Sequence, residues 1–494
     1  MPPKESIRVR IAPSPTGYFH FGTARTALFN WLFAKKLGGK FIVRIEDTDK
    51  SRSKKEYEEN ILKSLAWLGL TWDEGPSLDG KKYIGNYGPY RQSERIETYE
   101  KYLKELLEKN EAYYCFCKNE DLEAQKESQK AEGMAPKYLG HCRNLTSKEI
   151  DANLKAKKPS VIRIKIPEIK ITFNDLIRGK VSTDMNLLGD QVIAKSLSEP
   201  LYNFAVVVDD YLMKISHVIR AEDHIANTPK QIVIQKALNF NEVIYAHLPL
   251  ILNPDRSKMS KRFLDVSISD YEKDGYLPEA MVNFMALIGW HPKTERGEKE
   301  KEVFSLTELI KEFEIERVQK GGGIFNEEKL DWINNQYIKN IDSKIILEKL
   351  KSKNLIPENQ NLNEASVLKI IDLNKDRLKK LADFKSSSDF FFKIPNYDKN
   401  LLVWKKSTLI HAIICLQECL KVLNDLDEKE FVKSKLEMAL FSSLEKLGKG
   451  EVLWPLRVAL SGKEFSPPPY EIIEILGKSE SIKRIKDAID KLEK

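Results

Sequence analysis

A histidine and a glycine two residues apart, His20 and Gly22, are the first side chains along the sequence that could serve catalysis. Pro13 and Pro15 precede them, and each proline disfavours helix at the residue before it, so an extended loop is expected. A helical pattern follows, and a helix N-terminus attracts anions. Gly22 would let a base or a phosphate approach the backbone, while His20 could donate to phosphate oxygens. In isolation, such a pair is more often a loop histidine bonded to a carbonyl beside a turn glycine.

The elements around this pair are predicted to be a strand, a loop, a helix and a second strand. Apolar residues alternate with Arg8 and Arg10 over 7–11, recur at helical spacing over 24–32, and return as a strand over 41–45. Gly38 and Gly39 are expected to end the helix. Such a unit is right-handed and parallel in nearly all cases, so the loop and the helix N-terminus should lie at the carboxyl edge of a sheet.

Two separated motifs carry a resemblance to a known family. The stretch 12–24, APSPTGYFHFGTA, resembles the first signature of class I aminoacyl-tRNA synthetases in the wording of glutamyl-tRNA synthetases. The stretch 257–262, SKMSKR, is similar to the second signature of that class, the mobile lysine loop. The resemblance continues through 44–49, 90–95, 202–210, 218–224 and 455–462, so it covers essentially the whole chain.

This resemblance implies an α/β fold of class I type. It predicts a Rossmann-like parallel-sheet catalytic domain with an inserted acceptor-end domain, followed by an all-α anticodon-binding region. The chain is too long for one ordinary core. The expected domains are 1–110, the first half of the catalytic domain; 111–195, the inserted domain; 196–262, the second half with the lysine loop; 263–334, a helical connecting domain; and 335–494, the helical anticodon-binding domain.

The implied reaction joins L-glutamate to tRNA in two steps. Glutamate attacks the α-phosphate of ATP to give glutamyl-adenylate, and the 3′-terminal ribose of tRNA(Glu) then takes the glutamyl group. An enzyme supplies positioning and positive charge for such a displacement, and Mg²⁺ is expected with the ATP. The resemblance implies that the catalytic and ATP-binding residues are His20, Gly22, Lys258 and Lys261. It places the glutamate contacts at Arg10, Ser14, Glu46, Tyr202 and Arg220.

Arginine grips carboxylates in bidentate fashion, and an acidic side chain suits an ammonium. We therefore expect Glu46 to receive the ammonium of glutamate, and Arg10 and Arg220 to receive its two carboxylates. Which arginine binds the side-chain carboxylate stays open, and a salt-bridged Glu46 with purely structural arginines is the alternative.

Three cysteines suggest a structural zinc site. Cys115 and Cys117 share a tight turn and Cys142 returns later, but zinc requires four ligands. Many zinc-bearing relatives carry a histidine or cysteine two residues beyond the last cysteine, where this chain has Asn144. Some use a tyrosine four residues before it, so Tyr138 is the expected fourth ligand. His141 is a second candidate, and a metal-free turn with three reduced thiols is the alternative.

Composition excludes several classes of protein. An odd number of cysteines, five, argues against a disulfide framework and for a reducing compartment. The first ten residues lack the apolar run of a signal peptide, and no apolar segment approaches the ~20 residues of a membrane span. Neither a Walker loop nor a GxGxxG motif occurs. The net charge of +7 permits an RNA partner without identifying one. We expect a cytoplasmic monomer without membrane contact.

The prediction of amino-acid specificity depends on the residues of the first signature motif and on the secondary structure of the C-terminal part. Glutaminyl enzymes usually carry Pro-Glu-Pro-Asn where this chain has 13–16, Pro-Ser-Pro-Thr, and their C-terminal part is β-rich. Here that part is predicted to be helical, with Trp454 and Arg457 as anticodon-side candidates. Whether tRNA(Gln) is also a substrate stays open. A nucleotidyltransferase that does not act on tRNA, and a non-catalytic RNA-binding descendant of the enzyme, are the alternatives from other classes.

One segment has an ambiguous pattern. The run 204–208 is apolar and rich in valine, and we expect 202–209 and 212–218 to be a buried strand pair, or a strand and a turn, that returns to the sheet.

Overall fold

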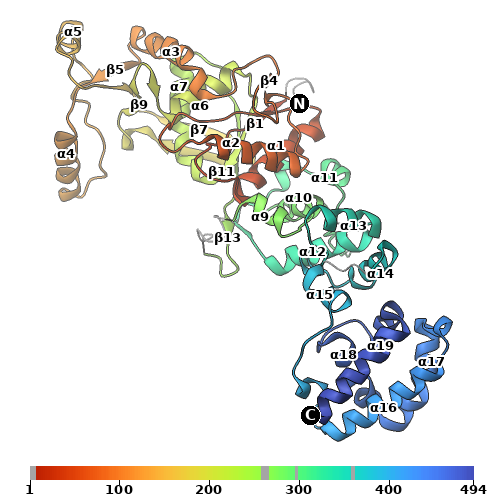
Figure 1. The fold of residues 1–494 in the computed structure, drawn as a ribbon. Helices are drawn as coiled ribbons and strands as arrows, with labels where there is room; N and C mark the ends of the chain where they lie inside the picture. The colour runs from red at the N-terminus through yellow and green to blue at the C-terminus, as the bar shows by residue number, and fades with distance from the viewer. Residues whose placement is uncertain (1–6, 258–265, 295–296, 298, 358–361) are drawn as a thin grey trace. The chain divides into compact units, whose positions relative to one another are not determined.

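The structure is a computed structural model that describes residues 7–257, 266–294, 297, 299–357 and 362–494. The chain forms two compact units, Met1–Glu272 with Pro278–Lys329, and Lys273–Leu277 with Leu330–Lys494. Figure 1 shows the α/β elements of the first unit and the helices of the second. Among the described residues, none of the helices combines the length and the apolar content that crossing a bilayer requires.

The first unit begins with the predicted strand, loop, helix and strand: β1 (Arg8–Ile11), α1 (Phe21–Leu37) and β2 (Lys40–Val43). The two strands are parallel, with Arg8 opposite Lys40, which confirms the predicted unit. Gly38 ends the helix in the left-handed conformation at φ 66°. Gly39 then passes so close to β1 that a Cβ there would lie 2.6 Å from the backbone oxygen of Ile7.

A second group of strands extends this sheet. The backbone N–H of Ser216 donates to the carbonyl of Arg8 at 2.9 Å, so the strand that follows Ser216 adjoins β1. That group has the order β11-β12-β7-β8, with β11 parallel to β12. The four strands are β7 (Lys170–Asp175), β8 (Gly179–Asp184), β11 (His217–Ala221) and β12 (Ile244–Leu248). Four further helices accompany the sheet: α2 (Lys55–Trp67), α3 (Ile96–Glu108), α6 (Tyr202–Leu212) and α7 (Thr228–Ala237).

The segment 111–195, expected to be one inserted domain, contributes to two sheets. An antiparallel sheet of order β10-β9-β6-β5 holds most of its strands. The hairpin β7–β8 pairs instead with β12 of the catalytic sheet, through Asp175 opposite Tyr245. The remaining elements of this region are β5 (Ala112–Cys115), α4 (Asn119–Ala131), α5 (Ser147–Lys155), β6 (Val161–Ile164), β9 (Gln191–Ser196) and β10 (Glu199–Pro200).

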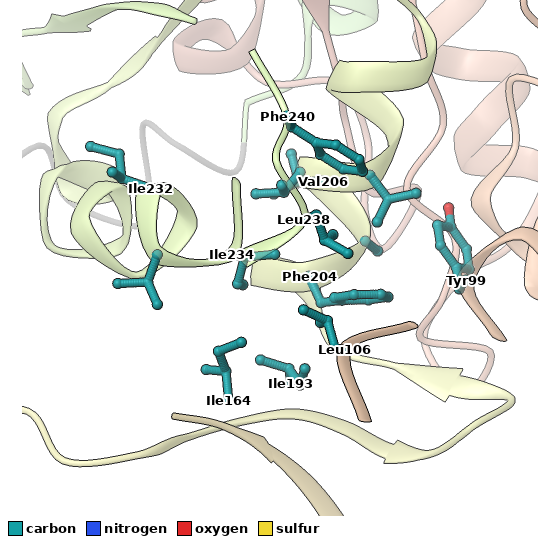
Figure 2. Close-up of a cluster of buried hydrophobic side chains, with 14 of the residues drawn as sticks. Tyr99, Leu106, Ile164, Ile193, Phe204, Val206, Ile232, Ile234, Leu238 and Phe240 are labelled. Atoms are coloured by element: carbon teal, nitrogen blue, oxygen red, sulfur yellow. The ribbon is translucent and has the colours of Figure 1, made fainter. Parts of the chain in front are cut away.

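The expectation of a strand over 202–209 is wrong, because this segment is the helix α6. Its residues from Phe204 to Asp210 are all buried, so the sequence shows no polar face and no helical period. Figure 2 shows Phe204 and Val206 among side chains from α3, α7 and the antiparallel sheet, including Leu106, Ile234 and Ile193. Burial on all sides therefore outweighs the β preference of the valines.

The rest of the first unit leads toward the lysine loop. Ile251–Leu252 (β13) runs parallel to Gly323–Ile324 (β14). Three helices, α9 (Ile268–Lys273), α10 (Pro278–Leu287) and α11 (Leu306–Glu312), lie between them in sequence. Elsewhere in this unit two short strands, β3 (Gly75–Pro76) and β4 (Tyr83–Ile84), pair as an antiparallel hairpin. The described part of the second unit is helical, as predicted. Its helices are α12 (Glu327–Asn340, which begins in the first unit), α13 (Ser343–Ser352), α14 (Glu364–Asn374), α15 (Asp383–Phe392), α16 (Leu409–Asp425), α17 (Lys433–Leu447), α18 (Lys449–Ser461) and α19 (Pro469–Glu493).

We predict that Gly39→Ala lowers the free energy of unfolding by about 1–3 kcal/mol, because its Cβ would overlap the Ile7 backbone oxygen that β1 must keep in place. Denaturant unfolding followed by circular dichroism measures this change. Gly17→Ala is the matched control, since a Cβ at Gly17 would meet no atom within 4 Å. Equal stability of the two variants would contradict the close approach of Gly39 to β1.

Candidate active site

A cavity of about 850 Å³ opens at the carboxyl end of the strands β1, β2 and β11. Seven residues singled out from the sequence line it: Arg10, Ser14, His20, Gly22, Glu46, Tyr202 and Arg220. Lys258 and Lys261 lie outside the described residues. The chain leading to them does contribute to the wall, through Pro249, Leu250 and Ile251.

Five of these residues lie on, or next to, the ends of helices and strands. Arg10 lies on β1, Glu46 follows β2, and Arg220 lies on β11. His20 immediately precedes α1, and Tyr202 is the first residue of α6. The carboxyl ends of parallel strands meet at one edge of a sheet, so residues far apart in sequence come together there.

The guanidinium of Arg44 lies at the centre of a buried ion cluster, and the side chain is 0 % exposed. Its nitrogens lie 2.7 Å from Asp210 Oδ1, 3.0 Å from Glu46 Oε1 and 3.7 Å from Asp209 Oδ2. Arg10 Nε lies 3.2 Å from Asp210 Oδ1. The cluster therefore fixes two of the residues that line the cavity, Arg10 and Glu46.

The cluster continues on the far side of Asp209. Arg95 Nε donates to Asp209 at 2.7 Å, Gln92 Nε2 at 2.8 Å and Tyr99 Oη at 2.9 Å. Formal charges within the cluster balance, with three arginines against three acids. These residues are Arg10, Arg44, Arg95, Glu46, Asp209 and Asp210.

The pKa values of two acids in this cluster, Glu46 and Asp210, are shifted in opposite directions. Burial raises the pKa of Glu46, and the charges of Arg44 and Arg10 do not offset the shift. Burial also acts on Asp210, but Arg10 and Arg44 outweigh it and lower the pKa of Asp210 overall. A cation placed beside Glu46 would lower the Glu46 pKa and favour its charged form. Glu46 is thus suited to a ligand ammonium, while Asp210 is committed to the arginines.

Arg220 is 5 % exposed and has different surroundings from Arg10. Its Nη2 donates to Thr228 Oγ1 at 2.7 Å and its Nε to His247 Nε2 at 3.2 Å, while the Tyr245 ring lies 5.5 Å from the guanidinium. Among the described residues, no acidic side chain forms an ion pair with Arg220, and its Nη1 has no hydrogen-bond partner. The charge of Arg220 is therefore left for a ligand.

Tyr202 and His224 form a polar pair on the wall of the cavity. Tyr202 Oη lies 3.2 Å from His224 Nδ1, and burial raises the pKa of Tyr202. Burial, followed by the positive charge of Arg220, lowers the pKa of His224 to about 4. His224 is therefore neutral near pH 7, and neither residue adds a charge to the cavity.

His20 is the N-cap residue of α1, and Gly22 lies in the first turn of that helix. The first N–H groups of a helix have no intrahelical partner, and those of α1 face the end of the sheet where the cavity opens. His20 Nε2 lies 3.0 Å from Thr23 Oγ1. A Cβ at Gly22 would meet only the His20 ring, at 3.6 Å, so the protein itself has room for a side chain there. The space beside Gly22 is available to a ligand.

The three cysteines of the expected zinc site also come together. The sulfur atoms of Cys115, Cys117 and Cys142 all lie within 4.8 Å of one another, with Cys117 Sγ 3.6 Å from Cys142 Sγ. Tyr138 Oη lies 3.4 Å from both Cys115 Sγ and Cys117 Sγ. His141 is exposed, and its Nε2 lies 2.8 Å from the side-chain amide of Gln125. Of the two candidate fourth ligands, Tyr138 is the one beside the sulfurs.

Comparison with known proteins decides the family. Residues 6–332 match the family described as tRNA synthetases class I (E and Q), catalytic domain, and residues 336–489 match an anticodon binding domain. The chain is 42 % identical to glutamate–tRNA ligase 2 of Thermoanaerobacter pseudethanolicus, over 99 % of both chains. It is 41 % identical to the glutamate–tRNA ligase of Clostridioides difficile, over 97 % of this chain and 98 % of the other.

The chain belongs to the glutamyl-tRNA synthetase family. A crystal structure of the glutamate tRNA ligase from Elizabethkingia meningosepticum in complex with its amino acid superposes with a TM-score of 0.85 at 35 % identity, covering 98 % of this chain and 99 % of the other. The glutamate-tRNA synthetase of Elizabethkingia anophelis gives the same TM-score and identity, over 98 % and 100 % of the chains. The predicted family and class I fold are confirmed.

Sequence reasoning gave no role to several residues that hold the synthetase cavity together. Arg44, Asp209, Asp210 and His224 fall within the resembling stretches without a role of their own, and His247 lies outside those stretches. A signal was available: Arg44 directly follows the apolar strand 41–43, and Asp209 with Asp210 ends an apolar run. Charged residues are almost never fully buried unless they are paired, so such positions indicate partners elsewhere in the chain.

We predict that Arg44→Met lowers the free energy of unfolding by about 3–5 kcal/mol, since it leaves Asp209 and Asp210 buried with too little positive charge. Chemical denaturation at pH 7 measures the loss. Arg52→Met removes an arginine from an exposed pair with Asp49 and should leave the free energy of unfolding close to that of the wild type. The cluster would not be the centre of the site if both substitutions had the same small effect.

Proposed function

We propose that this protein attaches L-glutamate to the 3′ end of tRNA(Glu) through glutamyl-adenylate, with ATP and Mg²⁺. The observation that carries the proposal is the cavity in which a helix N-terminus adjoins a buried arrangement of arginines and a glutamate side chain. The first feature suits a nucleotide and the second an amino acid with two carboxylates. An active synthetase needs both to be adjacent, because the glutamate carboxylate attacks the α-phosphate directly.

The glutamate subsite follows from the charges. The Arg44 cluster is neutral, while Arg220 adds a positive charge that is not paired with an acid among the described residues. Glutamate carries two carboxylates and one ammonium, hence a net charge of −1. Glu46 receives the ammonium, and Arg220 with Arg10 receives the carboxylates, while Tyr202 and the exposed Ser14 contribute hydroxyls. Because Asp210 already neutralises Arg10, Arg220 is the stronger of the two carboxylate sites.

The ATP subsite is assigned to the start of α1. His20 and the free N–H groups near Gly22 contact phosphate oxygens, and Gly22 leaves room for the base or ribose. Lys258 and Lys261, which follow β13 in the sequence, are assigned to the β- and γ-phosphates, where their charges would stabilise the charge that develops during displacement. Mg²⁺ enters with the ATP rather than through a dedicated set of protein ligands.

The helical C-terminal region is assigned to the anticodon. Burial, followed by the positive charge of Arg377, lowers the pKa of Arg457. Two neighbouring arginines favour contact with phosphate. The indole N–H of Trp454 donates to the Leu401 carbonyl at 2.8 Å, so this side chain supports the packing as well as offering a ring edge.

The three thiols and Tyr138 are proposed as a structural zinc site. Tetrahedral zinc with Zn–S bonds of about 2.3 Å separates its sulfurs by roughly 3.8 Å, and the 3.6 Å between Cys117 and Cys142 fits that spacing. The oxygen of Tyr138 is at a matching distance from two sulfurs. Bound zinc would join the turn after β5 to the distant segment around Cys142 and so support the antiparallel sheet.

The oligomeric state, the cellular compartment and the use of tRNA(Gln) are inferred from the sequence alone. A monomer in the reducing cytoplasm is the proposed state, and the five unpaired cysteines agree with that compartment. Whether the protein also charges tRNA(Gln) is the second question about its substrates. Full-length alignment with glutamate–tRNA ligases removes the support for the nucleotidyltransferase and non-catalytic alternatives.

The central test is transfer of labelled glutamate to purified tRNA(Glu) and, in separate reactions, to tRNA(Gln), with ATP and Mg²⁺. We expect charging of tRNA(Glu). Charging of tRNA(Gln) as well would define a non-discriminating enzyme, whose product a separate amidation must then correct. Folded protein that charges neither tRNA would contradict the proposed function.

A double variant, Lys258→Ala with Lys261→Ala, is the control for that experiment. Loss of charges that stabilise the transition state should lower the charging rate by about 10²-fold or more while leaving the unfolding midpoint unchanged. Undiminished charging by this variant would indicate a contaminating enzyme or a wrong assignment of the lysines.

We predict about one zinc per chain in protein purified without chelators or added metal, measured by elemental analysis. Cys142→Ser should remove the metal and lower the thermal unfolding midpoint. Cys419→Ser is the matched control, since Cys419 is buried in α16 of the other unit and should leave the metal content unchanged. Less than a tenth of a zinc per wild-type chain would exclude the site.

A further inference from the structure

Three buried side chains from three strands form a chain of hydrogen bonds behind the cavity. Asp175 ends β7, His247 lies on β12 and Arg220 on β11. His247 is opposite Arg220 in the parallel register of β11 and β12, and the single bridge that joins β7 to β12 brings Asp175 beside it. The His247 and Asp175 side chains are both 0 % exposed. His247 does not line the cavity, while Arg220 does.

The distances fix the proton positions on His247. Asp175 Oδ2 lies 2.6 Å from His247 Nδ1, and Arg220 Nε lies 3.2 Å from His247 Nε2. A guanidinium can only donate, so Nε2 must accept, and the proton must lie on Nδ1, where the carboxylate accepts it. Burial lowers the pKa of His247, in agreement with a neutral ring. The carboxylate therefore selects the one tautomer that can hold Arg220.

Asp175 is itself held firmly. Its Oδ1 accepts from the backbone N–H groups of Ile177 at 2.9 Å and Arg178 at 2.8 Å, within the tight turn between β7 and β8. The backbone N–H of His247 lies 3.2 Å from the same oxygen. Asp175 is thus fully bonded by the hairpin and by His247, and it has no free oxygen for a substrate.

These contacts hold Arg220 in one orientation. His247 accepts from Nε and Thr228 from Nη2, which leaves Nη1 unpartnered among the described residues. An arginine side chain has many rotamers, and fixing it before the ligand arrives removes an entropic cost of binding. It also fixes which edge of the guanidinium meets the ligand.

We propose that Asp175 and His247 are positioning residues that orient Arg220 and thereby set the affinity for an amino acid with a side-chain carboxylate. This inference rests on the proposed function, in which Arg220 binds a carboxylate of glutamate. A donor edge held in place binds a carboxylate well and a carboxamide poorly, because the amide NH₂ offers no acceptor. Loss of the orientation should weaken glutamate binding selectively, since ATP contacts lie at the start of α1.

The test compares two amides at one position. In His247→Gln the side-chain oxygen can take the place of Nε2 and still accept from Arg220, whereas in His247→Asn the shorter side chain reaches only the place of Nδ1. We expect His247→Asn to raise the KM for glutamate about tenfold or more, the effect of one hydrogen bond to a charged group. His247→Gln should stay within about threefold of wild type. The KM for ATP should stay within about twofold in both.

The measurement is ATP–pyrophosphate exchange by the full chain with tRNA(Glu) present, with the KM for glutamate and the KM for ATP determined separately. Asp175→Asn should also raise the KM for glutamate, since an amide no longer selects the tautomer. His217→Asn is the matched control. This buried histidine lies on β11 against Phe33 and outside the cavity, so both KM values should be unchanged.

Different outcomes separate the possible failures. An unchanged glutamate KM in His247→Asn, or a parallel rise of both KM values together with a lower unfolding midpoint, would overturn the proposal and leave His247 a purely structural residue. Rescue by glutamine but not asparagine, with an unchanged KM for ATP and equal unfolding midpoints for the two variants, would support it, because a packing defect would be larger for asparagine and would lower its unfolding midpoint. Wild-type protein without any exchange activity would instead contradict the proposed function itself.

Discussion

Burial of one arginine is the constraint on which the synthetase site depends. Arg44 cannot be removed from water unless acids surround it, and Glu46, Asp209 and Asp210 do so from the segment after β2 and from α6. Those acids in turn hold Arg10 on β1 and Arg95 before α3. A sheet strand, a following loop and a helix are thereby fixed to one another by charge at the place where the cavity opens. The ion pairs that stabilise the fold of this region are therefore the same ones that position the residues of the cavity.

This balance of charge also explains the chemistry of the cavity. Because the cluster is neutral, it presents no net attraction for anions, and recognition falls to the residues that it leaves incomplete. Glu46 has a raised pKa that a bound cation would lower, and Arg220 has no acidic partner among the described residues. A ligand with one ammonium and two carboxylates completes both. The distance between Glu46, which follows β2, and Arg220, which lies on β11, sets the length of ligand that fits.

The sequence predicted the local elements and the family well, and the long-range contacts poorly. The β1–α1–β2 unit follows from residue periodicity and from Gly38, which are local signals. The helix α6 did not, because its valine-rich, fully buried run has no period to detect. Asp175 and His247 are 72 residues apart and gave no common signal, since their pairing depends on a hairpin returning to a distant strand. Tyr138 was suggested by resemblance, and its place beside the sulfurs required the fold.

A crystal structure of the protein with L-glutamate bound would test the charge account most directly. The account predicts one carboxylate of glutamate within hydrogen-bond distance of Arg220 Nη1 and the ammonium beside Glu46, with the Arg44 cluster and the contact between His247 and Arg220 unchanged. Glutamate bound away from Arg220, or bound with its ammonium remote from Glu46, would contradict it.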